Sequence, residues 1–211
     1  MNILTFAAHQ AYLHLLGCLT EHRFYALLMP DQRRFLQNWD PRCRPLPQNF
    51  RLLERENLSS LLASQHFQLG IAHNLTDLQE LIAWKLPVVM VFHASLSGRM
   101  VEENTAIDPD QMRVSVNQLC RHHGVTQIFV TELKRSDWQA NGIVIEHGLN
   151  LADYGPYEGE KPFVLRVANH LAERGTLLRY DFHQAVTAGL PITLLGENPS
   201  LRIQPAASWT D

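Results

Sequence analysis

The chain has 211 residues, of which 45% are hydrophobic and 18% are charged, and its formal net charge is −3. This composition is typical of a globular protein with a sizeable core, and the scattered Lys and Arg residues argue against a nucleic-acid-binding surface. No apolar run approaches the roughly 20 residues needed to span a membrane, so we expect no transmembrane segment. The opening MNILTFAAHQ lacks the basic segment of a secretory signal.

The three cysteines, Cys18, Cys43 and Cys120, stand far apart in the sequence and form no CxxC pair. A sparse, odd set of this kind is typical of reduced thiols. Together with the absence of a signal segment, it predicts a cytoplasmic protein.

Short apolar runs alternate with amphipathic segments from residue 2 to residue 146. The pattern predicts strands at 2–8, 23–29, 66–72, 87–92, 126–131 and 142–146, and helices at 12–20, 57–64, 74–85, 108–123 and 133–139. The segment 30–50, rich in Pro, Arg and Asp, is predicted to be irregular. Strands that alternate with helices predict an α/β fold with a Rossmann-like, doubly wound parallel sheet and right-handed crossovers.

The pattern changes near residue 148. The segment GLNLADYGPYEGEKP (148–162) carries three Gly and two Pro, which predicts a linker. After it, a strand at 163–168, a helix within 175–188 and a strand at 191–196 predict one β-α-β unit, too small for a core of its own. We therefore expect a first domain at 1–147, a linker at 148–162 and the incomplete start of a second domain at 163–211.

Four histidines, His9, His73, His93 and His147, each follow a predicted strand directly. Because the carboxyl ends of parallel strands form the edge where ligands bind, we expect these side chains to face one crevice. The alternatives are hydrogen bonds to loop backbone, a metal site, and a site for a phosphate- or hydroxyl-bearing ligand. Without HExxH, HxH or CxxC, a metal site is the least favoured of the three, and we expect none.

Three later segments follow one another in a characteristic order: LPVVMVFHAS (86–95), HHGVTQIFVTELKRSDW (122–138) and GIVIEHGLNLADYGPYEGEKPFVLRVANHLAERG (142–175). This order resembles the GT-B glycosyltransferases, specifically the family-four-like retaining enzymes. The opening MNILTFAAHQ and the phrase EHRFYALLMP resemble the first two strands of the same family. The resemblance covers most of the chain.

The resemblance implies two Rossmann-like domains, the first binding a hydroxyl acceptor and the second a nucleotide-sugar, with no metal or other cofactor. His93 matches the histidine of the family's FHAS-like segment, which lies beside the transferred sugar, so the resemblance makes it the expected catalytic residue. The expected substrate-binding residues are His9, Gln10, His73, Ser95, His147 and Gly148.

The chain also departs from the family's pattern. The turn AAHQAY has no glycine before Gly17, so the usual Gly-rich phosphate cradle is missing. The chain ends at Asp211, before the places where the family carries a basic pair and paired glutamates that hold the donor.

Two functions follow from these observations. The first is a retaining glycosyltransferase, or its acceptor-binding half, that acts on a nucleotide-sugar and a hydroxyl acceptor. The alternative is a catalytically incomplete GT-B-like binding protein that self-associates or binds a partner chain completing the second domain. An unrelated α/β hydrolase or epimerase is disfavoured, because neither GxSxG nor GxGxxG occurs.

Overall fold

The computed structural model describes residues 1–8, 10–29, 39, 41, 44–103, 106–149, 151, 159 and 162–203. The chain divides into two compact units, Met1–Leu96 with Asp108–Leu149, and Ser97–Ile107 with Asn150–Asp211. The segment Ser97–Ile107 groups with the second unit, although it lies within the predicted first domain. The predicted limits at residues 147 and 162 stay a prediction.

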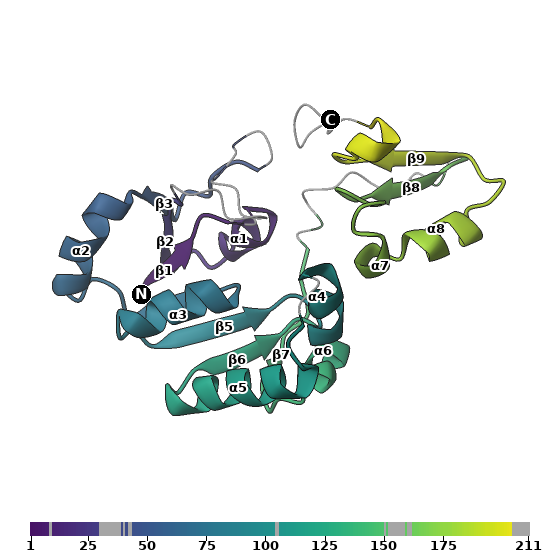
Figure 1. Ribbon diagram of the computed structural model, residues 1–211. Helices are drawn as coiled ribbons and strands as arrows, with labels where there is room; N and C mark the ends of the chain where they lie inside the picture. Colours follow the sequence, from purple (N-terminus) through teal and green to yellow (C-terminus); the bar gives the residue numbers. More distant parts are fainter. Residues whose placement is uncertain are drawn as a thin grey trace. The chain divides into compact units, whose positions relative to one another are not determined.

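The first unit is built on a seven-stranded sheet with the order β3-β2-β1-β4-β5-β6-β7, and neighbouring strands pair in parallel (Figure 1). The strands are β1 (Asn2–Phe6), β2 (Arg23–Leu27), β3 (Phe50–Leu53), β4 (Leu69–Ala72), β5 (Val88–Phe92), β6 (Thr126–Phe129) and β7 (Ile143–Val144). The helices are α1 (Gln10–Leu16), α2 (Arg55–Ala63), α3 (Leu75–Ala83), α5 (Pro109–His122) and α6 (Glu132–Asp137).

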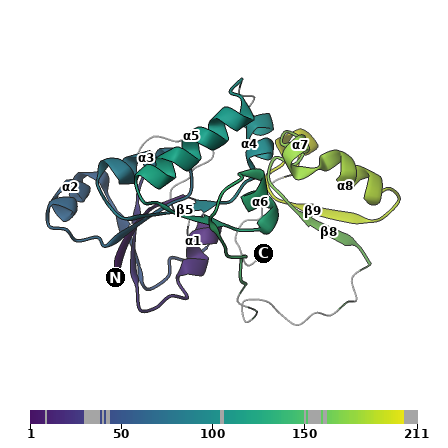
Figure 2. The ribbon, with the colours of Figure 1, turned by 90° about the horizontal axis from the view of Figure 1, so that it is seen from below.

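The strand order reverses between β1 and β4. The chain adds β2 and β3 on one side of β1, then crosses back and adds β4 to β7 on the other side. Right-handed crossovers then place the helices of the two halves on opposite faces, and Figure 2 shows α1 on one side of the sheet and α3 and α5 on the other. The predicted Rossmann-like, doubly wound α/β fold is confirmed, and its switch point lies beside the carboxyl ends of β1 and β4.

The helix starts follow the capping residues of the sequence. Asn74 caps α3 by accepting a hydrogen bond from the backbone N–H of Asp77 at 2.9 Å, as its type and position predict. Asp108 caps α5, and Pro109 occupies the first turn, where a missing N–H costs nothing. Both helices therefore begin where their sequences predict.

Two elements of the first 103 residues escaped the sequence prediction. Strand β3 is a four-residue edge strand with only Phe50 and Leu53 buried, so its apolar pattern is too short to stand out from the Pro- and Arg-rich segment before it. Helix α4 (Leu96–Glu103) begins with LSGR, in which Ser and Gly are weak helix formers. Most of the segment 30–43 lies outside the described residues.

The second unit contains most of α4 and a parallel pair of strands, β8 (Val164–Val167) and β9 (Ile192–Leu195). The predicted helix within 175–188 is two short helices, α7 (Gly175–Leu178) and α8 (Tyr180–Val186), separated by Arg179 in a left-handed conformation with φ 54°. Buried Asn198 joins the two strand ends: its Oδ1 accepts from the Leu171 N–H and its Nδ2 donates to the Ala168 carbonyl, both at 2.7 Å. The predicted β-α-β unit therefore forms, with an interrupted helix.

Of the cysteines that the structure describes, Cys18 is exposed and Cys120 is buried, and neither forms a disulfide. Burial raises the pKa of the Cys120 thiol to about 11. In the described part of the chain, no helix is both long and apolar enough to cross a membrane.

Gly142 allows β7 to pair with β6. A Cβ added there would lie 2.5 Å from the Phe129 ring and 2.6 Å from the Gln127 carbonyl oxygen, so we expect Gly142→Ala to lower the free energy of unfolding by about 1–3 kcal/mol. Gly148→Ala is the matched control: its Cβ meets nothing within 4 Å, and it should change stability by less than about 0.5 kcal/mol. Urea-induced unfolding of both variants tests this, and equal stabilities would contradict the close packing of β7 on β6.

Candidate functional site

A group of aromatic side chains gathers at the carboxyl edge of the sheet in the first unit. His73 follows β4, His93 follows β5, and His147 comes three residues after β7. Tyr12 lies in the first turn of α1, the helix that follows β1. The group therefore draws on both sides of the switch point, where doubly wound sheets bind their ligands.

His93 contacts the other three rings, and Tyr12 also contacts His147; we call the four residues the histidine cluster (Tyr12, His73, His93 and His147). The Nδ1 atom of His73 lies 2.9 Å from Nε2 of His93, within hydrogen-bond distance. The Tyr12 ring stacks on His93 at 4.5 Å and on His147 at 4.9 Å between centroids. The planes of His93 and His147 differ by only 9°, with their centroids 5.7 Å apart.

His73 is held by the start of α3. The buried carboxylate of Asp77 accepts a hydrogen bond from the Asn74 side chain at 2.8 Å and lies 3.5 Å from the backbone N of His73. Because Asn74 in turn accepts from the Asp77 backbone, the two side chains close a reciprocal pair of hydrogen bonds around the turn. This pair fixes the backbone from which the His73 ring projects.

His93 is fixed by the packing of the residues on either side of it. Phe92 stacks on Phe129 at 4.5 Å and meets the ring of Trp138 edge-on at 4.9 Å. The indole N–H of Trp138 donates a hydrogen bond of 3.0 Å to the carbonyl of Ala94. Trp138 is only 2% exposed, so this bond is shielded from water and holds the loop after β5 in place.

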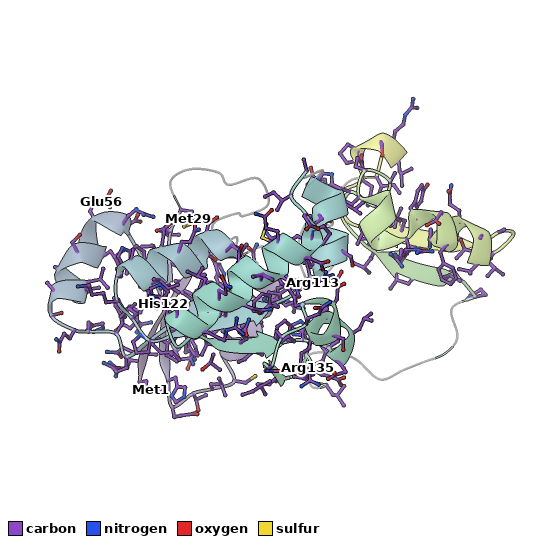
Figure 3. All side chains as sticks on the ribbon, turned by 60° about the horizontal axis from the view of Figure 1, so that its bottom comes forward. Met1, Met29, Glu56, Arg113, His122 and Arg135 are labelled. Atoms are coloured by element: carbon purple, nitrogen blue, oxygen red, sulfur yellow. The ribbon has the colours of Figure 1, made fainter. Side chains whose placement is uncertain are left out.

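Helix α5 in turn anchors Trp138. The Arg113 Nε donates to the Asp137 carbonyl at 2.6 Å, and the Asn117 side chain donates to the Trp138 carbonyl at 3.1 Å. Figure 3 shows Arg113 and His122 toward opposite ends of α5, and Asn117 lies between them in the sequence of the helix. The cluster thus depends on contacts made far from it in sequence.

The electrostatic surroundings keep His147 neutral. The residue is exposed overall, but the atoms packed against its ring remove part of the water around it, and this partial burial lowers the pKa of His147. The nearby Lys134 ammonium on α6 lowers it further. Burial also lowers the pKa of Lys134 itself. At neutral pH the ring of His147 is therefore an uncharged donor and acceptor of hydrogen bonds.

The His73–His93 contact restricts what the pair can do chemically. One of the two facing nitrogens must carry the hydrogen and the other must accept it, so both rings cannot be doubly protonated while the bond persists. The outer atoms of the pair, His73 Nε2 and His93 Nδ1, are buried. The pair is therefore one hydrogen-bonded unit in which each ring constrains the tautomer of the other.

The structure brings together three of the predicted site residues, His73, His93 and His147. Gln10 is buried at the start of α1, and Ser95 is half-buried two residues after His93. Gly148 is exposed beside His147 with open space around it. His9 lies outside the described residues.

Sequence reasoning missed Tyr12 and Lys134. Tyr12 lies at the start of a predicted helix. The signal that could have pointed to it is an aromatic residue that is exposed in the first turn of the helix after β1. Lys134 lay in a mixed-charge segment, and nothing in its spacing ties it to His147.

Within the described ranges, no group of three or more His, Cys, Asp or Glu side chains is arranged to hold a metal ion. The chain matches none of the protein-family models and none of the curated proteins with which it was compared. The chemistry of the histidine cluster is therefore the main guide to function.

We predict that Lys134→Met raises the pKa of His147, because it removes the nearby positive charge but keeps the aliphatic stem. The pKa should remain below 6.5, since the larger effect, burial, persists. An NMR titration of the imidazole protons measures it, with Arg135→Met, which removes a neighbouring cation paired with Glu132, as the control.

The same shift has a consequence for stability. The pKa of His147 is lower in the folded chain than its unfolded value of 6.5. Its contribution to the free energy of unfolding is therefore fully present above pH 6.5 and is lost as the pH falls through the folded-state pKa. This loss should be smaller in Lys134→Met. An unchanged His147 titration in that variant would contradict the assigned influence of Lys134.

Proposed function

We propose that the first unit is the acceptor-side domain of a retaining glycosyltransferase of the GT-B type. The reaction transfers a sugar from a nucleotide-sugar to a hydroxyl acceptor. The observation that carries this proposal is the hydrogen-bonded His73–His93 pair, stacked against Tyr12 and His147 at the sheet edge where ligands bind. The resemblance of the FHAS segment to that family gives His93 the role beside the sugar.

The chemistry of the cluster fits a sugar. Neutral imidazoles both donate and accept hydrogen bonds, as sugar hydroxyls do, and aromatic rings pack against the C–H faces of pyranoses. A phosphate would instead call for several cations or a Gly-rich turn at a helix start. The turn after β1 has no glycine before Gly17, so the cluster suits the sugar better than the diphosphate.

In this proposal Nδ1 of His93, which is buried until a ligand enters, hydrogen-bonds a sugar hydroxyl, and His73 fixes the tautomer of His93 through the hydrogen shared at Nε2. Charge that develops on the departing diphosphate needs stabilisation by positive groups. We assign that stabilisation to a donor-binding domain or to a partner chain, because the cluster's own rings are suited to hydroxyls.

A second candidate function is a binding protein that recognises a partner and transfers no sugar. Its support comes from the second unit, where Leu165 and Val167 on β8 and Phe182 and Val186 on α8 are exposed apolar side chains. Apolar side chains that gather on one unit are typical of surfaces covered by another protein or domain.

Isothermal titration of the chain with sugar-nucleotides distinguishes the two candidate functions. We expect UDP-glucose, UDP-N-acetylglucosamine or GDP-mannose to bind more tightly than the corresponding free nucleoside diphosphate, because the sugar adds contacts to the cluster. His93→Gln should weaken the binding of the sugar-nucleotide by about tenfold, the effect of one lost hydrogen bond in a partly buried site. The affinity for the free diphosphate should not change.

His123→Gln is the matched control, since His123 is exposed at the end of α5 and belongs to no part of the cluster. An equal effect of both substitutions would contradict the assigned role of His93, and a folded chain that binds no donor would favour the binding protein. Sedimentation velocity would then reveal self-association through the second unit.

A further inference from the structure

Tyr12 contacts two of the cluster's imidazoles at once, from the opposite side of the switch point. Its ring stacks on His93 with an angle of 28° between planes and on His147 with an angle of 19°. We infer that Tyr12 is the positioning residue of the histidine cluster: its ring orients His93 and His147 and screens the His73–His93 pair from solvent.

Tyr12 is suited to this role because its own backbone is well anchored. The next residue, Leu13, is fully buried in the core beside Ile3 and Phe24. The His14 ring is 3.0 Å from the Pro45 carbonyl, and Gly17 packs so closely on Pro47 that a Cβ there would clash. Helix α1 therefore presents Tyr12 from a fixed support.

Among the described residues, the backbone hydrogen bond nearest to His147 in sequence lies two residues before it and is donated by Ile145 to the Phe129 carbonyl at 2.9 Å. The His147 side chain is exposed, yet its plane lies within 9° of that of His93. Stacking on Tyr12 accounts for this alignment, because near-parallel, offset rings at about 5 Å are a favourable arrangement.

The cluster is consequently layered. Tyr12, 38% exposed, and the exposed His147 form its outer part, while His73 and the Nδ1 atom of His93 are buried. A ligand that reaches His93 from the side of these two residues meets Tyr12. That the ligand is a sugar rests on the proposed function, whereas the screening of His93 by Tyr12 does not.

Carbethoxylation by diethyl pyrocarbonate tests the inference without any ligand, because the reagent modifies accessible, unprotonated imidazole. His93 is the only histidine in the tryptic peptide 86–99, so mass spectrometry follows its modification separately. We expect Tyr12→Leu to increase the rate at His93 by about fivefold, the size of effect expected from one lost aromatic contact, and Tyr12→Phe to stay within about twofold of the wild type.

Tyr180→Leu is the matched control, since Tyr180 stacks on His183 at 6.1 Å in the second unit. It should leave the rate at His93 unchanged, and His170, whose side chain is 40% exposed, serves as the internal reference in every variant. The ring-current shifts of the His93 and His147 imidazole protons give a second measurement. The part of these shifts that the Tyr12 ring causes should be lost in Tyr12→Leu and kept in Tyr12→Phe, while the part caused by the neighbouring imidazoles remains.

The inference is overturned if Tyr12→Leu leaves the rate at His93 unchanged, if Tyr12→Phe behaves like Tyr12→Leu, or if His170 accelerates as much as His93. The last result would mean that Tyr12 acts on folding as a whole. If the variants show the expected carbethoxylation rates but the chain binds no sugar-nucleotide, the result counts against the glycosyltransferase proposal and still supports the role of Tyr12.

Discussion

One hydrogen bond, between Nδ1 of His73 and Nε2 of His93, connects the ends of two neighbouring strands of the sheet. It requires one imidazole to donate and the other to accept, so each ring constrains the tautomer of the other. The bond also brings together two side chains that are 20 residues apart in sequence. The chemistry available at this edge of the sheet depends on it.

The fold supplies what that bond needs. Because β4 and β5 are adjacent and parallel, their carboxyl ends meet at one edge beside the switch point. The capped turn of Asn74 and Asp77 sets the direction of His73, and the Trp138 indole holds the loop after His93. Since α5 fixes Trp138, the outer half of the sheet contributes to a site at its middle.

Much of this arrangement could be predicted from sequence, because it follows from local rules. The continuous apolar run of β5 predicts a strand covered on both faces, and the cap at Asn74 marks the start of α3. The positions of His73 and His93 then follow from where their strands end. His147 lies three residues past β7, because that strand ends at Val144 and not at the predicted residue 146.

The remaining features depend on tertiary packing. Whether Tyr12 faces the cluster depends on the rotation of α1 about its axis, which the burial of Leu13 and the contact of Gly17 with Pro47 decide. The influence of Lys134 on His147 arises across a turn and a strand, with no sequence spacing that signals it. The short edge strand β3 forms because β2 offers it a partner, and Phe50 stacks on Phe24 there.

The state of the two facing nitrogens is the most direct test of the central claim. Long-range ¹H–¹⁵N correlation spectra of the labelled chain at neutral pH report which imidazole nitrogens carry a hydrogen. We predict opposite states for His73 Nδ1 and His93 Nε2, one protonated and one not, with a scalar coupling between them across the hydrogen bond. Two protonated or two unprotonated nitrogens, without that coupling, would contradict the shared hydrogen bond and the site built on it.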